Sequence, residues 1–348
     1  MGHSRKLLGA VIAACVAITF VLAACGSSDS GGDSATSGST GSTTTGKADK
    51  DLTIGFSNYA LTIPFYQSMK AGIEDQAAKY GWKVVTTDSN FDAGKQASDV
   101  QGLLTQGVDA IIMSPGDANA LVPTAKAIAD AKIPLITASN QLADAAKPYV
   151  LTAYGRAWDQ VGEMKTDELA KLMGDKGKMA IIRGPSGTSF VIGTTEGSKR
   201  ALAQHPDIKA VFDRNAQSFE AGEGQRLAEA ALTANPDITG IWVENDDLAA
   251  GVAKAVADRG LTGKVHIVST DGSSVGVDLV RNGELDWTLG VPSYDAGKRM
   301  MEILHAYEAD GTKPAATEDA KILEITKDSI PEVDKVCEQT PKEIYCKQ

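Results

Sequence analysis

The chain has 348 residues, of which 43% are hydrophobic and 23% are charged. This composition is that of a globular protein and excludes a disordered or membrane-embedded chain. The length predicts two domains of roughly 100–150 residues each. The formal net charge is -11 and there is no dense run of Lys or Arg, which argues against nucleic acid as a partner.

The first elements in chain order are typical of an exported protein. Arg5 and Lys6 precede an apolar stretch at residues 7–24, which predicts a signal peptide over residues 1–24. Residues 22–25 read Leu-Ala-Ala-Cys and resemble the lipobox of bacterial lipoproteins, which predicts a lipid on Cys25. A similar tetrad ends at Cys15, but cleavage there would leave too short an apolar core. A transmembrane anchor is the alternative interpretation, although the apolar run is marginal in length.

The segment at residues 25–50 is rich in Gly, Ser and Thr. Such a segment cannot bury enough apolar surface to fold, so it predicts a flexible tether. Together with Cys25 it places the folded part outside the cytoplasm, on the outer face of the cell membrane.

The remaining cysteines, Cys337 and Cys346, predict a disulfide in a C-terminal tail at residues 327–348. The four histidines are scattered along the chain. We therefore expect neither a metal site nor a cofactor.

From residue 51 onward, strand-like and helix-like segments alternate. Strands are expected at 52–56, 82–86, 110–113 and 135–138, and helices at 64–80, 93–106 and 119–132. A helix at 158–173 then precedes strands at 179–182, 210–212, 240–243 and 266–269. Repeated βαβ units predict parallel sheets covered by helices. The expected fold class is α/β with two similar doubly wound lobes, and ligands of such sheets bind beyond the carboxyl ends of the strands.

Several short stretches, in this order and spacing, resemble the ribose-binding-protein-like family, the pentose- and hexose-binding components of ABC importers. They are Ile63-Pro64-Phe65-Tyr66, Gly107 to Ile112, Ile133 to Thr137, Gly187-Thr188-Ser189, Asn245-Asp246 and Asp271-Gly272. The resemblance covers residues 51–326. It implies a type I periplasmic binding protein whose lobes comprise residues 51–153 plus 292–326 and residues 154–291. It also implies a three-crossing hinge near Ala153, Val291-Pro292 and Ala320.

The same resemblance implies a set of ligand contacts, each of which has a simpler structural alternative. Phe65 and Tyr66 match aromatics that sandwich the ligand, or one of them packs on the sheet. Phe219 matches a second-lobe aromatic, or it is a surface residue. Asn245 matches an amide that contacts ligand hydroxyls, or it caps the following helix, a role that Asp246 could fill instead. Asp271 matches a carboxylate that accepts from ligand hydroxyls.

The chain departs from the family where fixed charges are expected. Ser139-Asn140 stand in place of an Asp-Arg pair, and Thr194 stands in place of a second arginine. These three residues are expected to contact the ligand in their stead. Ile63 and Val291 replace an asparagine and a hinge glutamine. The departures favour a small neutral hydroxylated ligand, such as a sugar, a deoxy sugar or a polyol. Arg183 could restore one charge, or it is a solvated loop residue.

No motif of an enzyme is present: the sequence lacks a nucleotide-binding glycine fingerprint and any convincing nucleophile-base arrangement. A repressor of the same fold would carry a DNA-binding domain in place of the expected signal peptide. The predicted function is therefore solute capture for an ABC permease by a monomer. A subunit that presents ligand to a membrane sensor remains the alternative.

Overall fold

The computed structural model describes residues 51–347. The predicted signal peptide, Cys25 and the tether lie outside these residues. Within residues 51–347, no helix combines the length and the apolar character needed to cross a membrane.

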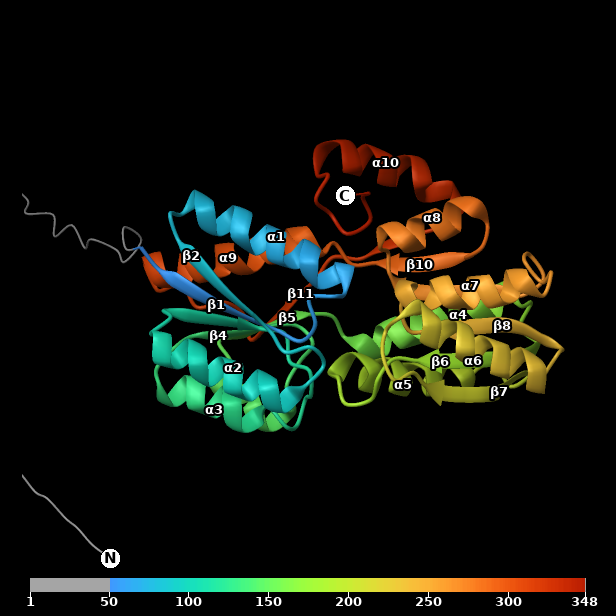
Figure 1. Cartoon of the computed structure of the whole chain (residues 1–348), viewed down its shortest axis with the longest axis horizontal. Coiled ribbons are helices and arrows are strands. Elements are labelled where there is room, and N and C mark those ends of the chain that lie inside the picture. Colours follow the sequence, from blue (N-terminus) through green and yellow to red (C-terminus); the bar gives the residue numbers. More distant parts are fainter. Residues whose placement is uncertain (1–50, 348) are drawn as a thin grey trace, which may run out of the picture. The chain divides into compact units, whose positions relative to one another are not determined.

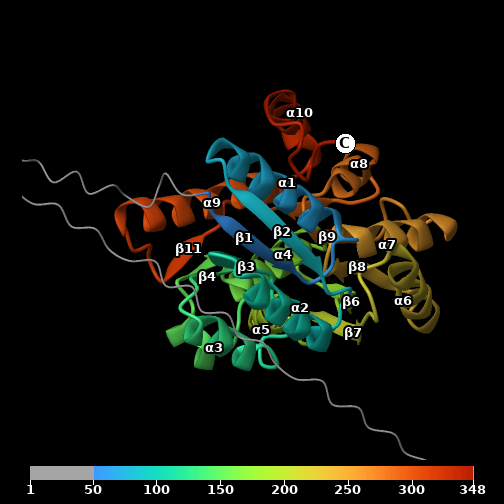
Figure 2. The same cartoon turned by 60° about the vertical axis from the view of Figure 1, so that its left-hand side comes forward.

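The first sheet is parallel throughout and has the strand order β11-β5-β4-β3-β1-β2. Its strands are β1 (Thr53–Asn58), β2 (Lys83–Asp88), β3 (Ala110–Met113), β4 (Leu135–Ser139), β5 (Thr152–Gly155) and β11 (Thr317–Asp319). Its helices are α1 (Pro64–Lys79), α2 (Ala93–Gln106), α3 (Val122–Asp130) and α9 (Ser293–Asp310), with a 3-10 helix η2 at Asp144–Tyr149. Helices α1 and α9 cover one face of this sheet, and α2 and α3 cover the other (Figure 2).

Local sequence explains the sharp limits of these elements. Every residue of β3 is buried, as expected of a short apolar strand between two covered faces. Helix α2 begins at Asp92, whose side chain accepts a hydrogen bond from the backbone N–H of Lys95. It ends at Gly107, which adopts the left-handed conformation that glycine tolerates best.

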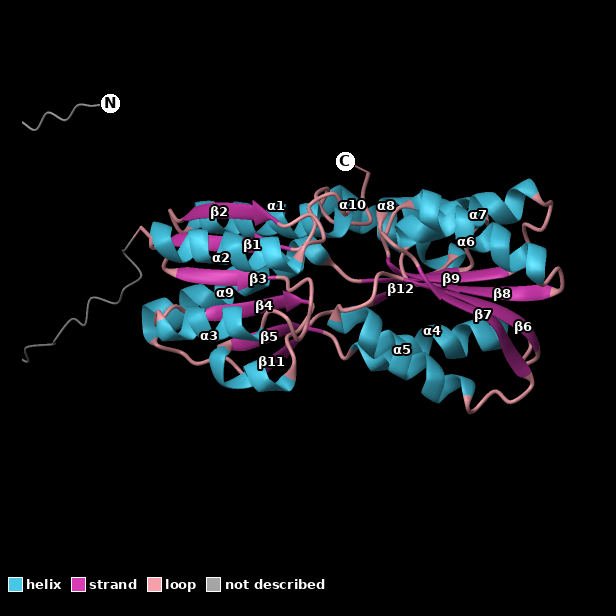
Figure 3. Cartoon of the chain, turned by 60° about the horizontal axis from the view of Figure 1, so that its bottom comes forward, coloured by secondary structure: helices cyan, strands magenta, loops and turns pink. Residues whose placement is uncertain are grey.

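The second sheet has the strand order β12-β10-β9-β8-β6-β7. Its strands are β6 (Gly177–Arg183), β7 (Ile208–Asn215), β8 (Ile238–Val243), β9 (His266–Asp271), β10 (Trp287–Gly290) and β12 (Leu323–Ile325). Its helices are α4 (Trp158–Leu172), α5 (Ser189–Leu202), α6 (Ala221–Ala234), α7 (Asp246–Asp258) and α8 (Ser274–Asn282). The pairs α4/α5 and α6/α7 lie on opposite faces of this sheet (Figure 3).

The chain passes between the two sheets three times: after β5, after β10, and between β11 and β12. This confirms the predicted fold class. The first crossing follows Gly155, near the predicted position, and Ala153 itself lies within β5, where it pairs with β4 and β11.

One predicted lobe boundary is wrong. Residues up to 326 were expected in the first lobe, but β12 pairs antiparallel with β10 in the second sheet. Pairing with β12 gives the edge of β10 hydrogen-bond partners. Ile325 is fully buried in the second lobe's core, which fixes the strand there.

The C-terminal tail contacts both lobes. Helix α10 (Ile330–Gln339) lies beside α8 (Figure 1), and Cys337 and Cys346 are joined with their Cα atoms 5.3 Å apart. The backbone N–H of Ser274, at the start of α8, donates to Ile344 O at 2.8 Å. On the first lobe, the hydroxyl of Ser68 donates to Lys342 O at 2.8 Å. The tail therefore spans the two lobes near the crossings.

Candidate ligand-binding site

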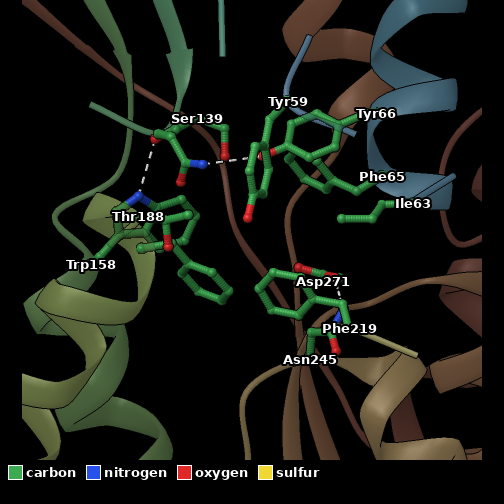
Figure 4. Close-up of a pocket in the computed structure, with 12 residues that line it drawn as sticks. Tyr59, Ile63, Phe65, Tyr66, Ser139, Trp158, Thr188, Phe219, Asn245 and Asp271 are labelled. Carbon is green, nitrogen blue, oxygen red and sulfur yellow. Dashed lines mark hydrogen bonds between the residues drawn. The ribbon is translucent and has the colours of Figure 1, made fainter. Parts of the chain in front are cut away.

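A cavity of about 420 Å³, including its part open to solvent, lies at the carboxyl ends of strands from both sheets. Figure 4 shows the side chains that line it. They are Tyr59, Ile63, Phe65, Tyr66, Ser139, Asn140, Trp158, Thr188, Phe190, Phe219, Asn245 and Asp271.

The first-lobe wall is built by the first turn of α1. Pro64 starts this helix because its fixed φ suits the first position and its missing N–H is not needed there. Phe65 and Tyr66 follow, with ring centroids 5.3 Å apart in an edge-to-face arrangement. Asn140 Nδ2 donates to the Tyr66 hydroxyl at 3.3 Å and to Pro115 O at 3.0 Å. Burial raises the pKa of Tyr66, so its hydroxyl stays protonated.

Tyr59 lines the same wall directly after β1. Its ring packs against Gly116, where an added Cβ would lie 2.3 Å from Tyr59 Cδ2. Only glycine allows this approach. Burial, together with the nearby Asp117 carboxylate, raises the pKa of Tyr59 to about 12. This hydroxyl also remains neutral and able to donate.

The second wall is aromatic as well. Phe190 lies between Trp158 and Phe219, with ring centroids 4.8 Å and 6.5 Å away respectively. Trp158 Nε1 donates to Ser139 O at 3.0 Å, which fixes the indole against the end of β4. A Cβ on Gly184 would lie 2.4 Å from Phe219 Cε1, so the glycine makes room for that ring.

The polar floor of the cavity is the pair Asn245 and Asp271. Asn245 Nδ2 donates to Asp271 Oδ2 at 3.3 Å, while Asn245 Oδ1 accepts from the Leu248 N–H at 3.1 Å. Asn245 thus caps α7 and also lines the cavity. Asp271 has φ 106°, a region that side chains other than glycine rarely adopt. Such strain is often found at functional sites, where the surrounding structure holds it in place.

Asp246 does not cap α7, although the sequence allowed that role. Its buried carboxylate points into the second lobe and accepts from Ser269 Oγ, from Thr288 Oγ1 at 2.7 Å and from Ser273 N at 2.6 Å. These contacts tie together the ends of β9 and β10. Burial raises the pKa of Asp246, and the three donors oppose that rise.

Behind the floor lies a buried lysine. Lys165 Nζ donates to Val243 O at 2.8 Å, Glu244 O at 3.0 Å and Thr270 Oγ1 at 2.9 Å, and it sits 3.6 Å from the Trp242 ring centroid. Burial lowers the pKa of Lys165 to about 7, although Glu244, Asp271 and Asp246 act in the opposite direction. The lysine therefore supports the strand ends that carry Asn245 and Asp271.

Comparison with known proteins places this arrangement in a family. Residues 54–313 match the periplasmic binding protein domain. The chain belongs to the periplasmic binding protein family. Members of this family are solute-binding proteins rather than enzymes and work outside the cytoplasm. The ribose-binding-protein-like resemblance read from the sequence is thereby confirmed.

Individual relatives have similar lengths. The ribose import binding protein of Bacillus subtilis is 29% identical over 267 residues, 76% of this chain and 85% of that protein. The xylitol-binding protein of Mycolicibacterium smegmatis is 29% identical over 328 residues, 92% and 85% of the two chains. A solved periplasmic ribose ABC transporter structure from Conexibacter woesei has a TM-score of 0.74 at 26% identity, covering 86% of this chain and 99% of that one.

Most residues predicted for the binding protein's site lie around the one cavity. These are Phe65, Tyr66, Ser139, Asn140, Phe219, Asn245 and Asp271. Their contact with a ligand stays a prediction. Thr194 does not line the cavity. Its hydroxyl donates to Glu244 Oε1 at 2.8 Å, behind the residues that form the cavity wall. Arg183 is also outside, and its guanidinium pairs with Asp213 at 2.8 and 3.0 Å.

Four lining residues were not predicted as ligand contacts from the sequence, namely Tyr59, Trp158, Thr188 and Phe190. Thr188 lies within the stretch Gly187-Thr188-Ser189 that resembles the family, and the other three lie next to segments that the sequence also singled out. Tyr59 directly follows the first strand, Thr188 and Phe190 flank Ser189, and Trp158 opens the first helix after the first crossing. For the three aromatic residues, the signal that could have found them is an aromatic side chain close to a strand-to-helix turn.

Proposed function

We propose that this protein is the lipid-anchored solute-binding component of an ABC importer. It captures a small hydroxylated compound of the sugar and polyol class in the cavity at the strand ends. The observation that carries the proposal is the cavity itself, in which aromatic rings from both lobes face the Asn245–Asp271 pair. The relatives named for ribose and xylitol support this ligand class.

The lining chemistry suits such a ligand. The C–H faces of a sugar or polyol pack on aromatic rings, while Asp271 accepts from ligand hydroxyls and Asn245 both donates and accepts. Ser139 and Thr188 add further hydroxyls. Because the contacts come from both lobes, a bound ligand favours the closed form, in which water is excluded and each hydrogen bond is stronger.

Ligand capture is tested first by a thermal-shift screen of residues 51–348 against sugars, polyols and small hydroxylated acids. A ligand present at a hundred times its dissociation constant stabilises the folded state by about 2.7 kcal/mol. For the best ligand, calorimetry on Asp271→Ala should then show binding weakened by about tenfold to over a hundredfold. Unchanged affinity in both Asp271→Ala and Asn245→Ala would refute this use of the cavity.

Membrane attachment depends on Cys25. The Cys25→Ala protein should remain an unprocessed precursor or be released in soluble form. Membrane partitioning equal to that of the wild type would contradict the lipid anchor.

Delivery to a permease is tested by uptake of the identified ligand into cells that lack this gene. Loss of uptake, restored by the wild-type gene, is the expected result. Normal uptake combined with loss of a ligand-dependent transcriptional response would favour the sensor alternative instead.

A further inference from the structure

The cavity carries one charged group. Among the lining residues that the structure describes, Asp271 is the sole carboxylate, and neither lysine nor arginine is present. Its hydrogen-bond partner in the cavity is a neutral amide, Asn245 Nδ2, at 3.3 Å. A carboxylate removed from water needs either donors or a counter-charge.

The nearest cations are engaged elsewhere. Arg183 forms a two-pronged ion pair with Asp213, and neither residue lines the cavity. Lys165 donates to two backbone carbonyls and to Thr270, and its charge acts on three carboxyl groups, those of Glu244, Asp246 and Asp271. One lysine thus stands against three acids, and it forms no direct ion pair with them. The carboxylates of Glu244 and Asp246 accept hydrogen bonds from hydroxyl and backbone N–H groups of the second lobe. Asp271 is the acid that faces the cavity, where its groups are open to a ligand.

The rest of the cavity is suited to a cation. Its aromatic side chains are Tyr59, Phe65, Tyr66, Trp158, Phe190 and Phe219. The faces of such rings carry negative electrostatic potential and attract ammonium groups, most strongly where water is excluded. In Figure 4, Asp271 and Phe219 lie side by side and face the cavity across from Tyr59.

We propose that the preferred ligand is a hydroxylated compound with one protonated nitrogen, and that its ammonium group binds Asp271 among the aromatic rings. This inference rests on the proposed function and refines its ligand class. It replaces the neutral ligand that the sequence favoured. The sequence indicated that the arginines of the family's binding site are missing. The structure adds that none of the described residues lining the cavity beside Asp271 is a lysine or arginine.

The protonation state of Asp271 depends on what occupies the cavity. Burial and the nearby Asp246 and Asp247 carboxyls raise its pKa well above the usual range, while Asn245 and Lys165 oppose the rise. A ligand ammonium would stabilise the ionised form. The competing arrangement is a protonated Asp271 that donates to a neutral ligand, and a matched pair of ligands separates the two.

The test compares polyols and cyclitols with their amino-deoxy counterparts, such as D-glucitol with 1-amino-1-deoxy-D-glucitol and myo-inositol with an amino-deoxy-inositol. Each pair differs by one hydroxyl replaced by an ammonium group. Calorimetry should show, in the best-binding pair, an affinity at least about tenfold higher for the aminated member. Asp271→Asn should abolish this preference, whereas Asp258→Asn, on the exposed face of α7, should retain it.

The outcomes separate the two proposals. Equal or tighter binding of the neutral members overturns the ammonium proposal and leaves solute capture intact. A preference for the aminated member that survives in Asp271→Asn also overturns it, because the charge would then act elsewhere. If no member of either set binds, solute capture of this ligand class fails along with it.

Discussion

The two lobes repeat one architecture but support their strand ends with different chemistry. In the first lobe the buried support is a neutral amide: Gln96 Nε2 donates to Ser114 O at 2.8 Å, and Gln96 Oε1 accepts from Gly116 N at 2.8 Å. In the second lobe the layer behind the strand ends holds Lys165, Glu244 and Asp246, all fully buried. Both sheets have the same strand order, but the strand ends are supported by a neutral side chain in the first lobe and by charged side chains in the second.

This difference indicates that the fold does not require buried ions at the cavity edge. Burying an ion is costly, and a well-packed neutral substitute is often as stable. The charged layer lies directly behind Asn245 and Asp271, since Lys165 contacts the backbone of Val243 and Glu244 and the side chain of Thr270. We therefore relate it to positioning the polar floor of the cavity.

The largest expected effect comes from breaking the charged layer. Lys165→Met keeps much of the volume but removes the cation, leaving buried carboxyl groups and two carbonyls without their partner. The free energy of unfolding should fall by about 3–5 kcal/mol. Urea denaturation followed by tryptophan fluorescence measures it, and a loss below about 1 kcal/mol would contradict the proposed role of the lysine.

A double-mutant cycle sharpens this result. Glu244→Gln removes one of the three acids near Lys165. If charge balance matters, Lys165→Met combined with Glu244→Gln should cost less than the sum of the two single changes. Strict additivity would mean that Lys165 acts through its backbone hydrogen bonds alone.

The next effect concerns the tail that contacts both lobes. Removing the Cys337–Cys346 disulfide by replacing both residues with Ala should lower stability by about 2–3 kcal/mol, because it frees a short loop in the unfolded chain. Reductant should have the same effect on the wild type and none on the double variant. Two alkylated thiols in the unreduced protein, seen by intact-mass measurement, would rule the bond out.

Breaking the neutral layer should cost less than breaking the charged one. Gln96→Leu leaves Ser114 O and Gly116 N without partners, so we expect a loss of about 1–3 kcal/mol. The free energy of unfolding of Gln96→Leu is measured under the same conditions as that of Lys165→Met, so that the two lobes can be compared directly. A larger loss for Gln96→Leu than for Lys165→Met would reverse the contrast drawn above.

The smallest effect is pH-dependent and again confined to the second lobe. Burial and the adjacent Asp246 raise the pKa of Asp247 to about 7. Because the folded state then binds this proton more tightly than the unfolded state, stability should fall as pH rises from about 4 to 7. Asp247→Asn should escape that fall. The pKa shift corresponds to about 4 kcal/mol, but Asp247 is partly exposed and its charge favours the start of α7. We therefore expect a gain of about 1 kcal/mol over the wild type at pH 8 and none at pH 3. Equal gains at both values would exclude titration of Asp247 as the cause.

Sequence predicted the elements best where a single physical signal dominates. β3 and α2 were placed to the residue, since one is a short apolar run between turns and the other lies between Asp92 and Gly107. β12 was assigned to the wrong lobe because three residues carry no signal of which sheet edge they pair with.

Some residues of the candidate site could be predicted from the sequence and others could not. Asn245 and Asp271 were found because the family resemblance places ligand contacts at the ends of these strands. In the structure Asn245 lies two residues after β8, and Asp271 is the last residue of β9. Thr194 was misplaced because spacing along a helix does not fix which layer a side chain reaches, and its hydroxyl faces Glu244. The buried role of Lys165 could not be predicted, since a lysine in an amphipathic helix is normally read as solvent-exposed.

The most direct test of the account is a crystal structure of residues 51–348 with the best ligand from the screen. We predict one ligand in the cavity, packed against Phe65 and Tyr66 of the first lobe and Phe219 of the second, with a hydrogen bond to Asp271. A ligand bound outside this cavity, or in contact with one lobe alone, would contradict the account.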